Sequence, residues 1–241
     1  MNGFETILFE KKDNIAYVTL NRPEVLNVYS VMMRDELYQV LGAIKDDDDI
    51  RVMVLKASGE RAFCAGADLS EFLTAPSPVI ARQVRWERDV WGLFLSVPQP
   101  IIAALNGYVL GSGLEMALCC DLRIASEDAQ FGLPEVRLGI IPAAGATQTL
   151  PRAVGRARAL DMLLSGIWFN AKEAHRAKLV NRVVSRDKLL PTIDRVAEKI
   201  ASYNPIMVRI AKQALMRGRE LPLAEALIME RRLSISVRQC T

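Results

Sequence analysis

The sequence predicts an α/β fold, in which strands and helices alternate to about residue 186 and helices alone follow to residue 241. Short apolar runs bounded by glycine or proline alternate with segments whose apolar residues recur every three or four positions, which is typical of α/β units. A chain of this length can bury a large core. We therefore expect a body over residues 1–186 and a helical C-terminal region over residues 187–241.

The expected strands share short apolar runs that end at glycine, proline or a polar pair. They cover residues 5–10, 15–20, 52–55, 101–105, 122–125 and 179–184. The first two are separated by Lys11-Lys12-Asp13-Asn14, which predicts a hairpin. In the strand over residues 122–125, the alternation of side chains directs Arg123 outward.

The expected helices share apolar residues at helical spacing. They cover a segment from Ser30 to the acidic run at residues 46–49, then residues 83–96, 114–120, 145–154, 156–164 and 171–178, and three segments beyond residue 187. Ser30 is a favourable N-cap for the first helix. Four acidic residues at the end of that helix oppose its dipole. Pro76 and Pro78 predict a mobile connection before the second helix.

Composition narrows the classes of function. The chain is 51% hydrophobic and 24% charged, the balance of an ordinary soluble globular protein. Its net charge of +3 is too small to indicate nucleic acid as a partner. Residues 90–114 are uncharged and long enough to span a bilayer, but prolines and glycines interrupt them. We expect no membrane span, and the polar start of the chain does not predict a signal peptide.

Cysteine and histidine usage argues against several kinds of site. Cys64, Cys119, Cys120 and Cys240 show no metal-ligand spacing, and the adjacent pair argues against a disulfide framework, which favours a reducing cytoplasm. His175 is the single histidine, and it lies on a charged helix where a surface position is expected. We therefore expect no metal site and no bound cofactor.

The stretch over residues 100–148 organises the rest of the chain. A buried strand, the glycine turn that includes Gly111-Ser112-Gly113 and a helix follow one another, which aims unpaired backbone N–H groups in front of the helix. A second small-residue loop, residues 64–68, also runs towards a helix. Two N–H groups that converge on one carbonyl oxygen form an oxyanion hole, worth about 3–4 kcal/mol per donor.

Two glutamates lie in apolar sequence near these loops. Glu115 is the only charged residue between Asp89 and Asp121, and Glu135 follows Phe-Gly-Leu-Pro. Two carboxylates with separated pKa values can divide acid and base roles. The structural alternatives are that Glu115 caps its own helix and that Glu135 pairs with Arg137 or Arg152.

Ordered motifs along nearly the whole chain resemble the crotonase superfamily, the enoyl-CoA hydratase/isomerase family. The matching motifs are Leu20-Asn21-Arg22-Pro23 with Leu26-Asn27, residues 63–69, Asn106-Gly107-Tyr108, residues 111–115, Cys120-Asp121, residues 131–135, residues 139–142 and residues 145–148. The resemblance implies a crotonase-like spiral of ββα units whose C-terminal helices build a homotrimer, commonly paired into a dimer of trimers.

The resemblance also implies an activity and its residues. Hydratases of the family add water across the 2,3 double bond of an enoyl-CoA thioester, so that coenzyme A enters as part of the substrate. The N–H groups of Ala67 and Ser112 would form the oxyanion hole. Glu115 would activate water, and Glu135 would protonate the α-carbon. The implied coenzyme A and substrate contacts are Ala65, Gly66, Ala67, Asp68, Leu69, Ser70 and Gly111.

Some positions depart from the family pattern, and rival functions stay open. Glycine is frequent in the family at four positions where this chain has Ser112, Ala143, Ala146 and Lys178, and Lys178 is expected at a strained helix end.

One rival function is that of a Δ3-Δ2 isomerase or another acyl-CoA lyase. Another is a non-catalytic acyl-CoA or RNA binder, although no basic stripe with aromatic residues appears. Residues 72–91 are expected to line the acyl pocket.

Overall fold

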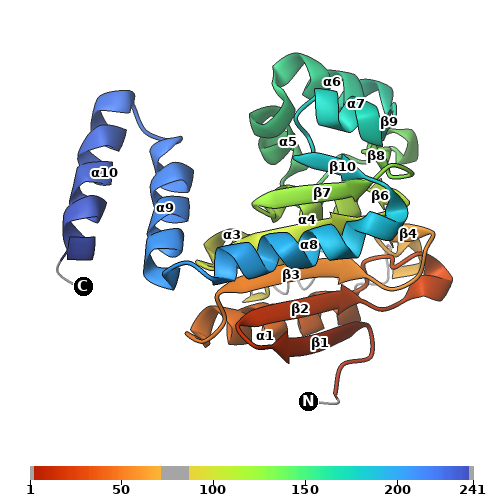
Figure 1. The fold of residues 1–241 in the computed structure, drawn as a ribbon. Helices are drawn as coiled ribbons and strands as arrows, with labels where there is room; N and C mark the ends of the chain where they lie inside the picture. The colour runs from red at the N-terminus through yellow and green to blue at the C-terminus, as the bar shows by residue number, and fades with distance from the viewer. Residues whose placement is uncertain (1–2, 72–86, 239–241) are drawn as a thin grey trace.

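The computed structural model describes residues 3–71 and 87–238, which form two sheets surrounded by helices (Figure 1). The large sheet has the order β1-β2-β3-β5-β7-β10, and the small sheet has the order β4-β6-β8-β9. The strands are β1 (Ile7–Lys12), β2 (Ile15–Leu20), β3 (Val52–Ala57), β4 (Ala62–Cys64), β5 (Ile101–Leu105), β6 (Tyr108–Leu110), β7 (Leu122–Ser126), β8 (Gln130–Gly132), β9 (Phe169–Asn170) and β10 (Arg182–Val184).

The helices lie around these sheets. The α-helices are α1 (Val31–Asp46), α3 (Val90–Ser96), α4 (Ser112–Cys119), α5 (Ala146–Val154), α6 (Arg156–Ser165), α7 (Ala171–Arg176), α8 (Arg186–Ala201), α9 (Pro205–Gly218) and α10 (Leu223–Arg238). Short 3₁₀ helices are η1 (Pro23–Val25), η2 (Leu69–Glu71) and η3 (Glu135–Leu138). Figure 1 shows α8 lying across one face of the large sheet and the α9–α10 pair standing beside the body.

The large sheet is buried on both faces, which explains the continuous apolar runs in the sequence. In β3, Val52 and Val54 pack in the core under α8, whereas Met53 and Leu55 pack in the main core on the other face. All strand pairs of this sheet are parallel except β1–β2. That pair is the predicted hairpin, and its first strand lies two residues later than expected.

The chain repeats one path through both sheets. It leaves β5 of the large sheet, enters β6 of the small sheet and continues into α4; it then passes from β7 to β8 and on towards α5. Strand, strand and helix therefore recur as a spiral of ββα units, as the family resemblance implied. The consequence is that β4, β6 and β8, which are mutually parallel, all end on the same side of the small sheet.

Several local predictions are confirmed. Ser30 accepts a hydrogen bond from the N–H of Met33 at 3.2 Å and caps α1. At the end of the same helix, Lys11 pairs with Asp47 of the acidic run at 2.7 Å, a contact that the sequence did not predict. Lys178 has a positive φ of 64° just beyond α7, as its position at a helix end predicted.

Other predictions are corrected. The helix expected over residues 83–96 is interrupted, because Asp89 caps a new helix at Val90 by accepting the N–H of Gly92; residues 83–86 lie outside the described ranges. Arg123 does not point outward: its guanidinium donates to the carbonyl oxygens of Cys120 and Leu179 and holds the end of α4. The segment after Asn106 was expected to be a turn, but it contains strand β6.

The C-terminal helices differ in their packing. Leu189, Ile193 and Ala197 of α8 are buried on the large sheet, so this helix joins the core although the sequence grouped it with the C-terminal region. By contrast, α9 buries none of its residues. It is fixed to the body where Lys212 pairs with Asp121 at 2.6 Å. The domain boundary at residue 186 stays a prediction.

Across residues 3–71 and 87–238, no helix is both long enough and apolar enough to cross a bilayer. The apolar stretch over residues 90–114 is divided among α3, β5, β6 and the start of α4. The expected mobile connection around Pro76 and Pro78 lies outside the described residues.

Candidate active site

Two loops meet where β4 and β6 end, and their backbones touch. A Cβ built on Gly113 would overlap the carbonyl oxygen of Cys64 and lie 2.8 Å from the Cys64 Cβ. A Cβ built on Gly111 would lie 3.4 Å from the Cα of Gly66. The approach at Gly113 is possible only because this residue carries no side chain, whereas Gly111 and Gly66 lie at an ordinary contact distance. The structure therefore brings together the two small-residue loops that the sequence singled out.

The N–H group of Ala67 faces away from Tyr29, the residue that pairs with its loop. Ala67 forms a parallel bridge with Tyr29, whose N–H donates to the Gly66 carbonyl and whose carbonyl accepts the Asp68 N–H, both at 2.8 Å. In a parallel bridge, the residue between the two bonded neighbours points its own N–H the other way. Within the described part of the chain this N–H has no acceptor, so it is available to a ligand.

The N–H group of Ser112 lies at the start of α4. Gly111 precedes it with φ 50° and ψ −123°, a conformation that favours glycine, and donates its own N–H to the carbonyl of Gly132 at 3.0 Å. The first N–H groups of a helix have no intrahelical acceptor. Hence the Ser112 N–H is directed out of the N-terminal end of α4, beside the loop that carries Ala67.

Glu115 is held by a different helix. Its side chain is only 3% exposed, and its Oε1 accepts the backbone N–H groups of Ala144 at 2.9 Å and Ala146 at 3.1 Å. Ala146 is the first residue of α5, so the carboxylate sits at the positive end of that helix. Two backbone donors and a helix N-terminus stabilise the ionised form of this buried group.

Glu135 is buried with less support, because among the residues described only its own backbone N–H favours the ionised form. Its side chain is 9% exposed, and no hydrogen-bond donor among the described residues reaches its Oε2. Burial raises the pKa of Glu135 to about 7, and the negative charge of Glu115 adds to the shift. The Oε1 of Glu135 would lie 3.2 Å from a Cβ built on Gly111. This places an acid that is half-protonated near neutral pH against the glycine loop.

The proposed ion pairs of Glu135 do not form among the described residues. Arg152 instead lies 3.3 Å from Glu220, and the guanidinium of Arg137 lies against Gly166.

His175 is exposed on α7, as expected for a surface histidine. Cys119 and Cys120 are buried in the main core, and burial raises the pKa of the Cys119 thiol to about 12.

Hydrogen bonds from Arg22 and Asn27 hold the Ala67 loop and the strand before it in place. Arg22 donates to the Asp68 carboxylate at 3.0 Å and to the Val28 carbonyl at 3.0 Å. Hydrogen bonds from Ser70 and then from Arg22 lower the pKa of Asp68, which favours its ionised form. Asn27, which is 1% exposed, donates to the carbonyls of Ser58 and Ala62.

Sequence reasoning missed the positioning roles of Arg22 and Asn27. The motifs Asn21-Arg22-Pro23 and Leu26-Asn27 contain both residues, but nothing in the sequence places these motifs beside residues 64–70.

The residues predicted to contact coenzyme A differ in their surroundings. The Ala65 N–H is bonded to the Leu26 carbonyl at 3.1 Å, while Leu69 and Ser70 lie exposed in η2. Their contact with coenzyme A stays a prediction, and residues 72–86 of the expected acyl pocket are outside the described ranges.

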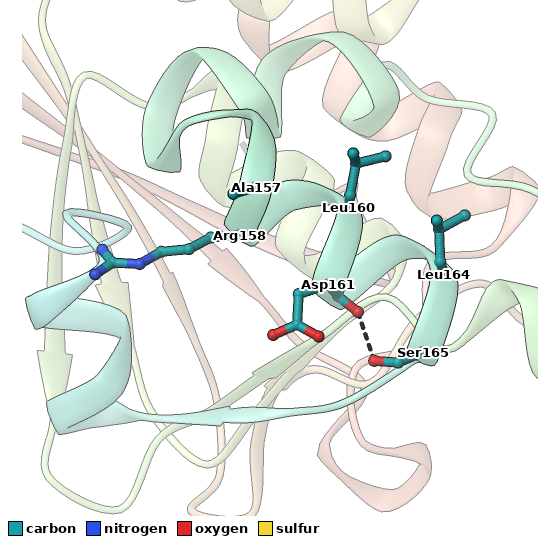
Figure 2. A pocket seen from close by; sticks show the side chains of 6 residues that line it. All are labelled: Ala157, Arg158, Leu160, Asp161, Leu164 and Ser165. Carbon is teal, nitrogen blue, oxygen red and sulfur yellow. Dashed lines mark hydrogen bonds between the residues drawn. The ribbon is translucent and has the colours of Figure 1, made fainter.

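A separate hollow of about 550 Å³ lies on the outer side of α6 (Figure 2). It is lined by Ala157, Arg158, Leu160, Asp161, Leu164 and Ser165. None of the predicted site residues contributes to it, so it is distinct from the site of the two glutamates. In the described ranges no group of three histidine, cysteine or acidic side chains is arranged to bind a metal ion.

The contact between the loops predicts opposite effects for two helical glycines. Gly113→Ala should lower the free energy of unfolding by about 1–3 kcal/mol, because its Cβ meets the Cys64 backbone. Gly42→Ala, in the open interior of α1, should raise it by about 0.5–1 kcal/mol. Urea denaturation of both variants checks this. Equal stability of the two variants would contradict the close packing.

Comparisons with known proteins give a consistent result. The family model described as enoyl-CoA hydratase/isomerase matches residues 10–240. The chain is 41% identical to an (E)-benzylidenesuccinyl-CoA hydratase of Thauera aromatica over 92% of this chain and 86% of the relative. It is 38% identical to a crotonyl-CoA hydratase of Syntrophomonas wolfei over 95% and 88% of the two chains.

A solved structure agrees with the sequence relatives. The crystal structure of an enoyl-CoA hydratase from Bacillus anthracis superimposes with a TM-score of 0.93 at 38% identity, covering 98% of this chain and 92% of that chain. The repeated strand, strand and helix path and the two sheets are thus those of crotonase-fold proteins. From its motifs, its fold and these matches, the chain belongs to the enoyl-CoA hydratase/isomerase family.

Proposed function

We propose that this protein is an enoyl-CoA hydratase, which adds water across the 2,3 double bond of an enoyl-CoA thioester. One observation carries the proposal: two buried glutamates beside the same pair of loops have opposite electrostatic environments. Glu115 is stabilised as a carboxylate by the start of α5. Glu135 has a pKa of about 7 because it is buried. Water addition needs one base and one acid, and this pair supplies both.

The N–H groups of Ala67 and Ser112 take the thioester oxygen in this mechanism. As water attacks the β-carbon, the π electrons move onto that oxygen, and two aligned donors stabilise the developing enolate. Because both donors are backbone groups fixed by neighbouring hydrogen bonds, they need little reorganisation during the reaction. Glycine contacts between the two loops keep the donors on one side of the substrate.

The two glutamates then move the protons. Glu115 accepts a proton from water while the water oxygen bonds to the β-carbon. When the enolate collapses, Glu135 donates its proton to the α-carbon, so that the product gains one hydrogen and one hydroxyl. The mechanism assigns the chemistry to these side chains and backbone groups, and coenzyme A enters as part of the substrate.

The relatives support this choice. Two of them carry the names of CoA-thioester hydratases, and the matching family model covers hydratases and isomerases together. A Δ3-Δ2 isomerase moves a proton between two carbons and requires a single base. The presence of a second buried glutamate, Glu115, therefore favours hydration over isomerisation. A cytoplasmic location remains the expectation from cysteine usage.

The first test is hydration of crotonyl-CoA. The purified protein should remove the absorbance of the conjugated thioester, and Glu135→Gln should slow this by about 10²–10⁴-fold, since Gln cannot donate the proton. Glu127→Gln, at an exposed glutamate near β7, is the matched control and should react at the wild-type rate. Unchanged turnover by Glu135→Gln would refute its role. Turnover of a 3-enoyl-CoA that survives Glu115→Gln would instead indicate an isomerase.

The pH dependence separates the two activities. Hydration requires that the pair Glu115 and Glu135 carry one proton, held by Glu135. The kcat/KM for hydration should therefore fall as the pH rises through about 7, because Glu135 loses that proton. Dehydration of the product should fall in parallel, because the overall equilibrium constant does not depend on pH. An isomerase needs ionised Glu135 as its base, so its rate would rise over the same range. Initial rates between pH 5.5 and 9 distinguish these outcomes.

A homotrimer, or a dimer of trimers, is the assembly we propose. The basis is that α9 and α10 expose large apolar residues: Ile206, Leu215, Leu223, Leu227, Ile228 and Ile235. Light scattering should give three or six times the chain mass of 26.8 kDa. Leu223→Asp should reduce the mass, whereas Leu164→Asp, similarly exposed on α6, should not. A monomer at micromolar concentration would contradict the assembly.

A further inference from the structure

The outer face of the small sheet carries an aromatic pair close to the candidate site. The rings of Tyr108 and Trp168 lie edge to face with centroids 5.8 Å apart. Both side chains are about 40% exposed. Tyr108 belongs to β6, and Trp168 immediately precedes β9, so the pair spans β8, which lies between those strands.

Trp168 lies directly on Gly132, the last residue of β8. The antiparallel register pairs Phe131 with Phe169, so the next pair along is Gly132 with Trp168. A Cβ built on Gly132 would overlap the Cδ1 of the indole and lie 2.8 Å from its Nε1 and 3.0 Å from its Cγ. The indole therefore occupies the place that any larger residue at 132 would fill.

Gly132 also forms the last pair between β6 and β8. It is the register partner of Leu110, and its carbonyl accepts the N–H of Gly111 at 3.0 Å. Beyond this point the two strands separate. The first continues into Ser112, and the second continues to Glu135 three residues later. One backbone hydrogen bond thus fixes the spacing of the proposed oxyanion donor and the proposed acid.

We propose that Trp168 is a positioning residue for the reaction: it covers Gly132 and keeps its hydrogen bond to Gly111 closed. Glycine in a strand has the largest backbone freedom and no side chain to pack, and a cross-strand aromatic ring compensates for both. Hydrogen bonds at the end of a ladder open readily when water reaches them. This inference rests on the proposed hydratase function, because it concerns the alignment of Ser112 and Glu135.

A purely structural role for Trp168 makes a different prediction. If the indole only adds to stability, its removal lowers the melting temperature and leaves the turnover of the folded enzyme unchanged. If it positions the site, turnover falls at temperatures where the variant is fully folded. The thioester would still bind, so KM should change little while kcat falls.

The first experiment compares Trp168→Ala and Trp168→Phe at a temperature well below both melting transitions. Trp168→Ala should lower kcat for crotonyl-CoA hydration by about 10–100-fold with less than about a threefold change in KM, the scale expected for a small misplacement. Trp168→Phe should recover most of the rate, because a ring again covers Gly132. Tyr203→Ala removes a comparably exposed aromatic side chain near α9 and should leave kcat unchanged.

A double-variant cycle tests the contact itself. Gly132→Ala should displace the indole and lower kcat as Trp168→Ala does, since Gly132 has no positive φ that would add strain of its own. The combined variant has room for the new Cβ. Its loss should therefore be no larger than that of Trp168→Ala alone. Losses that multiply would show that the two residues act independently and would overturn the proposal.

Hydrogen exchange gives a readout that does not require activity. The Gly111 amide should exchange at least about tenfold faster in Trp168→Ala than in the wild type, while the amides of β3 remain protected. If the wild type does not hydrate crotonyl-CoA, the proposed function fails, and exchange alone still reports on the covered hydrogen bond. Unchanged exchange at Gly111 together with unchanged kcat would refute the positioning role.

Discussion

The candidate site depends on the contact between two backbones at the ends of β4 and β6. Gly113 lies against the carbonyl of Cys64 at a distance that leaves no room for a Cβ, and Gly111 lies close to Gly66. Everything else is arranged around this contact. The bridge to Tyr29 turns the Ala67 N–H away from Tyr29, and α4 begins after Gly111 in the other loop. Main-chain atoms of both loops take part in this contact.

The two glutamates differ in the charge state that their surroundings favour, because different elements support them. Glu115 leaves α4 but is held at the start of α5, where two N–H groups and the helix dipole favour its charge. Glu135 stands in a short 3₁₀ helix, where burial and the neighbouring carboxylate favour its neutral form. Two identical side chains are thus made chemically different by their surroundings.

Sequence patterns predicted the parts of this architecture that depend on local order. The hairpin, the Ser30 cap and the helix that begins after Gly111 all follow from residues close together in the chain. What could not be predicted depends on distant partners. Arg123 was placed outward by strand alternation, but carbonyls at the end of α4 bind it. The helix breaks at Asp89 because the side chain of this residue caps a new helix, although the spacing of the apolar residues predicted one continuous helix.

Contacts between residues far apart in the chain also could not be predicted at the candidate site. Both glutamates and both loops could be proposed from motifs, but the hydrogen bond from Arg22 to Asp68 joins residues 46 positions apart. The contact of Trp168 with Gly132 arises only when β9 pairs with β8. The joining of α8 to the large sheet likewise requires knowledge of the sheet order, because its apolar residues have the same spacing as those of α9.

The anchoring of Glu115 by the main chain of residues 144 and 146 has a consequence for evolution. An amide N–H is present whatever side chain the residue bears, proline excepted, so residues there can change without altering what stabilises the charge. Ala146, which stands where the family pattern frequently has glycine, is an example of such a change. Under the proposed mechanism, the side chains at residues 144 and 146 can therefore diverge in a lineage while the main-chain groups that hold the carboxylate of Glu115 are inherited intact.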